Sequence, residues 1–77
     1  MLLPNKYENI SQNYLSLGKD VIKILKNKRN IYDLFKELVA YRKDEYELTI
    51  QKYLFTLDML YALGLIKLEG ENIVKLK

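Results

Sequence analysis

The chain has 77 residues, no cysteine, no histidine and a formal net charge of +3. This length provides one domain, near the lower size at which a hydrophobic core alone stabilises a fold. A chain without cysteine forms no disulfide or thiolate metal site, and a chain without histidine lacks the commonest general base and metal ligand. Composition therefore favours a binding module over an enzyme, and we expect no cofactor.

The charge is unevenly distributed along the chain. Residues 1–29 carry a net charge of +4, residues 30–60 a net −2 and residues 61–77 a net +1. A dedicated nucleic-acid binder has a more uniform positive field. The apolar runs are too short to cross a bilayer, and the N-terminus lacks the pattern of a secretory signal. We therefore expect a cytoplasmic protein without a membrane contact.

The N-terminal ten residues show neither a helical nor a strand period, and Pro4 favours an extended conformation at Leu3. We therefore predict an N-terminal arm over residues 1–10, followed by one domain over residues 11–77. The apolar start of this arm includes Leu2 and Leu3. It could fold back onto the domain, dock on a partner or fray in solvent.

The first helix is predicted at residues 12–27, with Asn9 or Ser11 as its N-cap. Its apolar face covers about half of the circumference, which is enough to pack on two sides. The opposite face is either solvated or a surface for phosphate or an acidic partner. On that face lie three lysines: Lys19, Lys23 and Lys26.

A second helix is predicted at residues 31–43, capped by Asn30. Tyr46 and Leu48 alternate with acidic residues, which favours a short strand before the third helix. Thr49 can cap that third helix. The apolar period of the second helix predicts a buried stripe of Ile31, Leu34, Phe35, Leu38 and Tyr41.

The third helix is predicted at residues 49–63, and Gly64 provides a left-handed residue that ends it. Its helical period gives a core face and an outward face. The predicted core face consists of Ile50, Tyr53, Leu54, Leu57, Leu60 and Tyr61. The predicted outward face consists of Leu48, Phe55, Met59 and Ala62, beside Gln51 and Lys52.

A β-hairpin is predicted to follow the third helix, with strands at residues 65–69 and 73–76. Side-chain parity pairs Leu68 with Val74 and Ile66 with Leu76, which leaves residues 70–72 as the loop. The expected fold class is mainly α with a small antiparallel β-hairpin (α+β). Its expected architecture is a winged helix-turn-helix.

The outward face of the third helix is poorly suited to reading DNA. Arg, Lys, Asn, Gln and Ser are the usual readers of base edges, whereas Phe55 and Met59 occupy the centre of this face. Either the sheet or the arm covers these two side chains, or they form an apolar protein interface. No sequence pattern indicates a catalytic or metal site, because the acidic run at residues 44–47 is typical of a solvated linker.

Three segments resemble one protein family: LLPNKYENIS, QNYLSLGKDVIKIL and LDMLYALGLIKLEGENIVKL. They are similar to the small middle components of three-component ABC-ATPase systems, which are bacterial cassettes associated with defence against phage and other foreign DNA. The resemblance covers nearly the whole chain. It implies a non-catalytic adaptor between an SMC- or Rad50-like ABC ATPase and a variable third component.

Two hypotheses follow. In the first, the chain is an adaptor whose winged helix contacts protein, and DNA is contacted only weakly or within a complex. Its expected contacts are Leu2, Leu3, Phe55 and Met59, with Lys19, Lys23 and Lys26 as a rim. In the second, the chain is a small DNA-binding transcriptional regulator. Its phosphate contacts would be Lys23, Lys26, Lys28 and Arg29, and its base contacts Gln51 and Lys52. A homodimer through Phe55 and Met59 is a third option.

Overall fold

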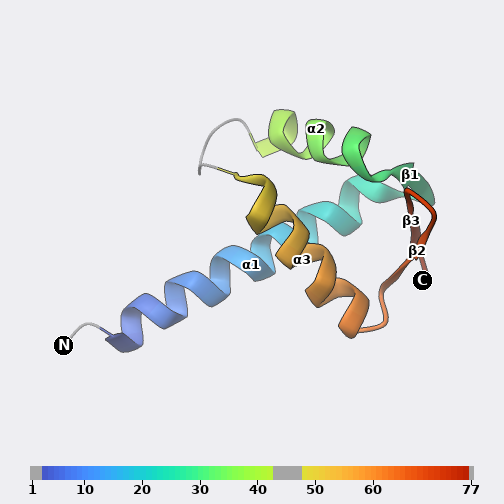
Figure 1. Cartoon of the computed structure of the whole chain (residues 1–77). Coiled ribbons are helices and arrows are strands. Elements are labelled where there is room, and N and C mark those ends of the chain that lie inside the picture. Colours follow the sequence, from blue (N-terminus) through green and yellow to red (C-terminus); the bar gives the residue numbers. More distant parts are fainter. Residues whose placement is uncertain (1–2, 43–47, 77) are drawn as a thin grey trace.

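The computed structural model describes residues 3–42 and 48–76, and it describes side chains from Tyr14 onward. The described residues form three helices and a three-stranded antiparallel sheet (Figure 1). This arrangement confirms the predicted α+β class. The elements are α1 (Leu3–Leu25), β1 (Lys28–Asn30), α2 (Ile31–Arg42), α3 (Ile50–Ala62), β2 (Ile66–Glu69) and β3 (Asn72–Lys75).

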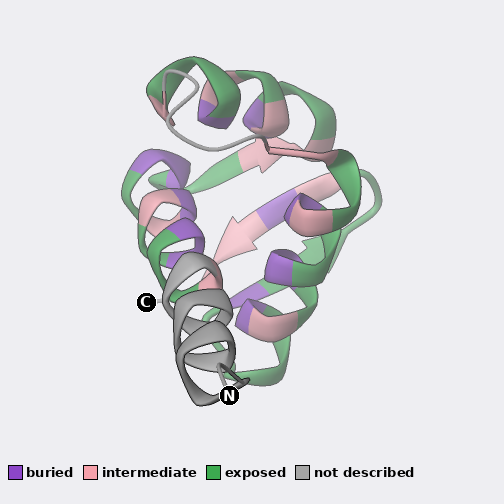
Figure 2. Ribbon diagram, turned by 90° about the vertical axis from the view of Figure 1, so that its left-hand side faces the viewer, coloured by how far each residue is buried: buried purple, intermediate pink, exposed green. Residues whose placement is uncertain are grey.

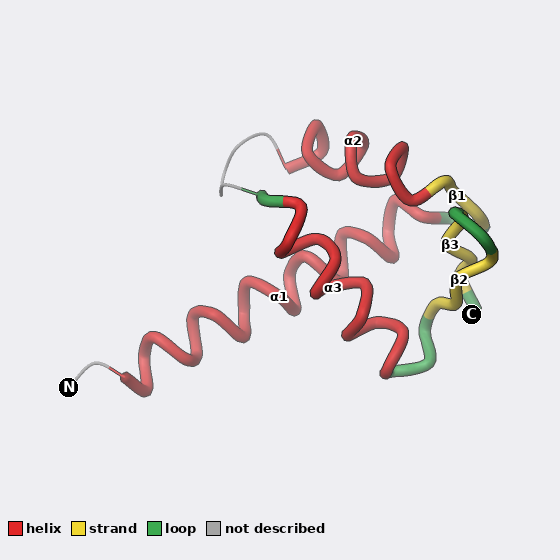
Figure 3. Tube along the Cα trace, in the orientation of Figure 1, coloured by secondary structure: helices red, strands yellow, loops and turns green. Residues whose placement is uncertain are grey.

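Helix α1 begins at Leu3, so the predicted start at residue 12 and the irregular conformation predicted for residues 3–10 are wrong. Pro4 lies in the first turn, where a missing N–H breaks no intrahelical bond. The predicted caps Asn9 and Ser11 both lie inside the helix. The helix ends at Leu25 because Lys26 adopts a left-handed φ of 61°. The N-terminal half of α1 extends away from the rest of the fold (Figure 3).

Helix α2 begins where its sequence signals predicted. The Asn30 Oδ1 atom accepts hydrogen bonds from the backbone N–H groups of Tyr32 at 2.8 Å and Asp33 at 3.2 Å, which confirms the predicted cap. Of its predicted stripe, Leu34 and Leu38 are buried, whereas Tyr41 is exposed. The strand predicted before α3 falls mainly on residues 45–47, which lie outside the described residues.

The sheet has the strand order β1-β3-β2, and β1 was not predicted. In the hairpin, Leu68 lies opposite Ile73 and Glu69 opposite Asn72, so the predicted register is wrong by one residue. Gly70 takes a φ of 63° at the first position of a two-residue turn, which glycine does at low cost. This shorter turn directs Ile73 into the core from the central strand.

The core lies where α1, α2, α3 and the inner face of the sheet meet (Figure 2). The Tyr53 ring is fully buried, and its centroid lies 4.9 Å from that of Phe35 on α2. Helix α3 packs closely on α1 at Gly18, where an added Cβ would lie 3.2 Å from Met59 Cε. The largest fully buried side chains are Tyr53, Leu25, Leu34, Leu38, Ile66, Ile73, Val21 and Thr56.

The buried face of α3 differs from the predicted face. Thr49 caps the helix as predicted, because its Oγ1 atom accepts from the Lys52 N–H at 3.2 Å. Leu54 and Tyr61 are exposed, however, although they were predicted to lie in the core. Met59 instead turns towards α1, since glycine at residue 18 leaves space for it. The predicted core face was therefore correct for Tyr53, Leu57 and Leu60 and wrong for Ile50, Leu54 and Tyr61.

Tyr53→Phe is expected to lower the free energy of unfolding by about 1 kcal/mol. The Tyr53 hydroxyl donates a hydrogen bond of 2.6 Å to the Ile31 carbonyl, and burial raises the pKa of this phenol above its usual value. Ile31 is the first residue of α2, so its carbonyl keeps an intrahelical bond and the loss stays moderate. Urea unfolding measures the change. Tyr32→Phe, at an exposed tyrosine on α2, is the control, and an equal loss in both variants would contradict the assignment.

Candidate functional site

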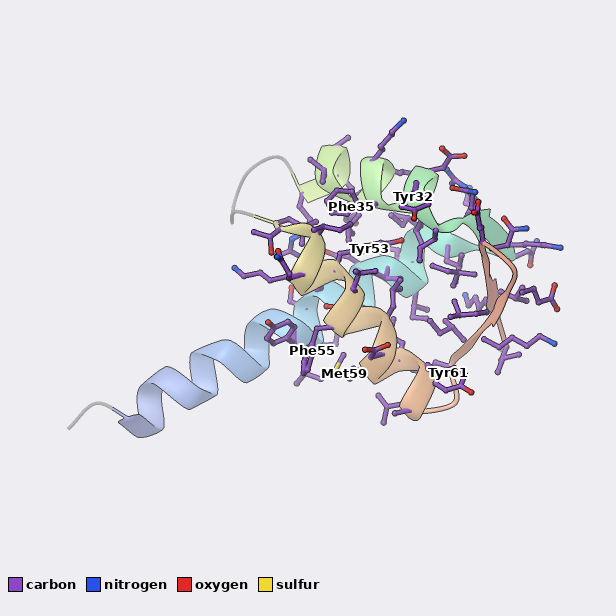
Figure 4. All side chains as sticks on the ribbon, viewed as in Figure 1. Tyr32, Phe35, Tyr53, Phe55, Met59 and Tyr61 are labelled. Carbon is purple, nitrogen blue, oxygen red and sulfur yellow. The ribbon has the colours of Figure 1, made fainter. Side chains whose placement is uncertain are left out.

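The outward face of α3 is an exposed and mainly apolar surface. Six side chains on this face are exposed, and among them Gln51 and Asp58 are the ones with an amide or a carboxylate group. Figure 4 shows Phe55 near the middle of this helix and Tyr61 towards its C-terminal end. We call it the α3 surface. Its members are Gln51, Leu54, Phe55, Asp58, Tyr61 and Ala62.

The structure distinguishes the two residues at the centre of the predicted outward face, for which either burial or an apolar interface was expected. The Phe55 side chain is 55% exposed, and its ring centroid lies 4.7 Å from the Tyr14 ring on α1 at an interplanar angle of 59°. Met59 is half-buried and packs against the core beside Gly18. Phe55 and Tyr14 therefore form an aromatic pair at the surface, whereas Met59 mainly stabilises the contact between α1 and α3.

A groove of about 600 Å³ lies between α3 and β2. Its lining is mostly apolar, with Asp58 and Lys67 as its charged residues. The groove was not predicted, because the helical period placed Leu54 and Tyr61 in the core. Their spacing is that of buried residues, but the rotation of α3 exposes both side chains. The groove is lined by Ile31, Leu54, Leu57, Asp58, Tyr61, Ile66, Lys67 and Leu68.

The predicted rim lysines are all exposed. Lys19 and Lys23 lie on α1, and Lys26 follows the last residue of that helix. The Lys23 Nζ atom lies 6.0 Å from the centroid of the Tyr41 ring, at the limit of a cation–π contact. Of the predicted apolar contacts in the arm, Leu2 lies outside the described residues. Leu3 begins α1, at the end of the helix that extends away from the fold.

Two of the six residues predicted for the DNA-binding alternative, Lys28 and Arg29, form ion pairs with carboxylates. Lys28 Nζ lies 3.5 Å from Glu69 Oε1, and the Arg29 guanidinium forms an ion pair with Glu37. The Lys67 ammonium also lies 3.3 Å from Glu69. Lys67 first, and Lys28 second, hold the pKa of this carboxyl below its usual value. These pairs reduce the positive charge that β1 offers to a phosphate.

The two residues that this alternative predicts as base contacts lie at the start of α3. Gln51 is exposed and Lys52 is half-buried. Asp58 lies two helical turns after Gln51 on the outward face of α3. If α3 entered the major groove of DNA, it would therefore bring a carboxylate close to the DNA. This geometry is unfavourable next to the DNA backbone, because like charges repel.

Neither a metal site nor a membrane span is found in the part of the chain that the structure describes. No group of three or more His, Cys, Asp and Glu side chains is placed to hold a metal ion there. No described helix is long and apolar enough to cross a membrane.

Comparison with known protein families finds a match that covers most of the chain. No curated protein and no solved structure matches the chain. A family model for ABC-three component (ABC-3C) system Middle Component 7 matches residues 3–75. The matched region begins with the first residue of α1 and ends with the last residue of β3. The chain therefore belongs to the Middle Component 7 family of ABC-three component systems.

Proposed function

We propose that this middle component is a non-catalytic adaptor that joins an SMC- or Rad50-like ABC ATPase to a further component of its system. The system would act against phage or other foreign DNA in bacteria. Membership of a multi-component system supports the existence of protein partners. The observation that carries the adaptor role is the apolar character of the α3 surface and of the groove beside it.

We interpret the fold as a winged helix-turn-helix, and we place the protein in the cytoplasm. In this interpretation α2 and α3 form the helix-turn-helix pair, and the β2–β3 hairpin is the wing. The second helix of such a pair is the one that enters a DNA groove. In this chain that helix presents Leu54, Phe55 and Tyr61, which are side chains typical of protein interfaces. The recognition helix of the adaptor would therefore contact protein.

The charges on β1 and on the α3 surface are unfavourable for the alternative function, DNA binding. The basic side chains Lys28 and Arg29 are paired with carboxylates, and Asp58 lies on the α3 surface. The exposed lysines of α1 could still add a weak phosphate contact within an assembled complex. Salt distinguishes the two functions, because the logarithm of a DNA affinity falls by about 0.9 per phosphate contact for each log unit of salt. An apolar protein interface depends little on salt.

Phe55→Ala is expected to weaken binding to the ATPase of the same system by at least about tenfold, or 1.4 kcal/mol. Aromatic anchors contribute much of the affinity of an interface, whereas rim charges mainly affect the association rate. Lys23→Ala should therefore change the dissociation constant little and slow association at low salt. Calorimetry and biolayer interferometry with the purified ATPase measure these effects.

The matched control for this experiment is Tyr32→Ala, which removes an exposed aromatic side chain from α2. Circular dichroism of each variant checks that the fold is kept. An equal loss of affinity for the Tyr32 and Phe55 variants would remove the support for the α3 surface. Nanomolar, sequence-selective binding to duplex DNA that Gln51→Ala or Lys52→Ala abolishes would replace the adaptor with a regulator.

A further inference from the structure

Strand β2 is an edge strand with one unpaired side among the described residues. The strand order β1-β3-β2 places β3 on one side of it and no described strand on the other. Edge strands are usually kept from pairing with another chain by short length, charged side chains, a proline or a bulge, and β2 has four residues and carries Lys67 and Glu69. The pairing of β2 with β3 is continuous over all four residues of β2, and the strand contains no proline. It therefore keeps the regular geometry that a further strand requires.

The backbone groups of Ile66 and Leu68 point towards this unpaired side. The Leu76 N–H donates to the Leu65 carbonyl at 3.0 Å, which identifies this pair as hydrogen-bonded across β2 and β3. Hydrogen-bonded and non-hydrogen-bonded pairs alternate along an antiparallel ladder. Residues 67 and 69 therefore bond to β3, and the N–H and C=O groups of residues 66 and 68 face outward.

In β2, an exposed apolar side chain lies between two side chains of opposite charge. Leu68 lies opposite Ile73 on the inner face of the sheet, yet its side chain is 55% exposed. Lys67 and Glu69 lie on the outer face, two residues apart and with opposite charges. A strand that carries a cation and an anion on either side of an apolar residue is complementary to itself when its direction is reversed.

We propose that two copies of this chain pair through β2, antiparallel and about a two-fold axis at Leu68, to form one six-stranded sheet. The outward N–H and C=O groups of Leu68 then bond to those of Leu68 in the second copy. Lys67 of each copy lies opposite Glu69 of the other, in non-hydrogen-bonded pairs, where cross-strand side chains approach most closely. The inference concerns β2 and does not depend on the proposed adaptor function.

The charges select this register over its neighbours. An axis at Lys67 would place two lysines opposite each other, and an axis at Glu69 would place two carboxylates opposite each other. An axis at Leu68 avoids both arrangements and forms two opposite-charge pairs. Leu68 lies next to Ile73 within each copy. With the axis at Leu68, the two Leu68 side chains are neighbours, so the four side chains form a continuous apolar row across the inner face.

The opposite edge of the sheet is much less suited to such pairing. Strand β1 has three residues, two of which are the charged Lys28 and Arg29. Its last residue, Asn30, directly caps α2, so the strand ends in a helix. A second copy that paired there would place basic side chains next to basic side chains. Self-association is therefore expected at β2 and not at β1.

Sedimentation of the full-length chain over a concentration series tests the proposal. The wild-type chain is expected to form dimers, and Lys67→Glu or Glu69→Lys alone should raise the dimer dissociation constant at least about tenfold, because each places like charges opposite each other twice. An equimolar mixture of the two variants should restore dimers as heterodimers, in which both pairs are again of opposite charge. Lys19→Glu changes the net charge by the same amount as Lys67→Glu but lies on α1, so it should leave the dimer unchanged.

The mixing experiment separates the interface from effects within one chain. Both substitutions break the Lys67–Glu69 pair inside a chain, and mixing cannot repair that pair. Rescue on mixing therefore reports a contact between chains. A wild-type chain that stays monomeric throughout the series would overturn the proposal. Dimers that resist both substitutions, or variants that do not recover on mixing, would overturn it as well.

Discussion

Leu57→Ala is expected to lower the free energy of unfolding by about 2–5 kcal/mol, which is the usual loss for a leucine removed from a core. The Leu57 side chain is only 5% exposed and belongs to the core cluster between α1, α3 and the sheet. A domain of this size has a total stability on the order of 5–15 kcal/mol or less. At about 4–8 °C for each kcal/mol, the thermal midpoint should fall by at least about 8 °C.

Leu54→Ala is the matched control for this prediction. Leu54 lies one turn earlier on the same helix and is 43% exposed, so its truncation should lower the free energy of unfolding by less than about 1 kcal/mol. Thermal and urea unfolding of both variants measure the difference. Similar losses for Leu54 and Leu57 would mean that α3 buries a different face. Because Leu54 belongs to the α3 surface, its truncation should instead weaken binding to the ATPase.

The parts of the fold that local sequence determines were predicted correctly. Asn30 and Thr49 cap their helices through short-range hydrogen bonds, and Gly64 ends α3 with a left-handed φ of 78°. These signals act within a few residues and need no knowledge of the remaining chain. The apolar periods of α2 and α3 gave the correct central core residues for the same reason, since the 3.6-residue repeat is a local property.

The parts that were wrong depend on contacts between distant residues. Strand β1 has only three residues and no apolar pattern, and it forms because β3 provides its partner. The hairpin register depends on that central strand, which buries Ile73 rather than Val74. The start of α1 was placed too late because the first residues of a helix show no apolar stripe unless they pack. Such features are set by tertiary structure and override local pattern.

The candidate surface was predicted in part for similar reasons. Charge and helical period correctly predicted that Lys19 and Lys23 are exposed, and they left open whether Phe55 and Met59 are covered. They failed for Leu54 and Tyr61, because the rotation of α3 follows from its packing on α1, where Gly18 allows Met59 to approach. The sequence contains this glycine, but its consequence follows only from the packing of the two helices.

Gly18→Leu is expected to lower the free energy of unfolding by about 1–3 kcal/mol or more, because it overpacks the contact between α1 and α3. A Cβ atom at residue 18 would lie 3.2 Å from Met59 Cε and 3.3 Å from Leu60 Cδ2. Both distances are shorter than ordinary carbon–carbon contacts of about 3.5–4.0 Å. The further atoms of a leucine would therefore require α3 to move away from α1.

Gly18→Ala separates this effect from helix propensity. Alanine in place of glycine inside a helix stabilises by roughly 0.5–1 kcal/mol, and small shifts of the two flexible side-chain ends should use up most of this gain. We expect the alanine variant to stay within about 0.5 kcal/mol of wild type and the leucine variant to be clearly less stable in urea unfolding. A leucine variant as stable as wild type would mean that the two helices are not held together at Gly18. The rotation of α3 that exposes Leu54 and Tyr61 would then need another cause.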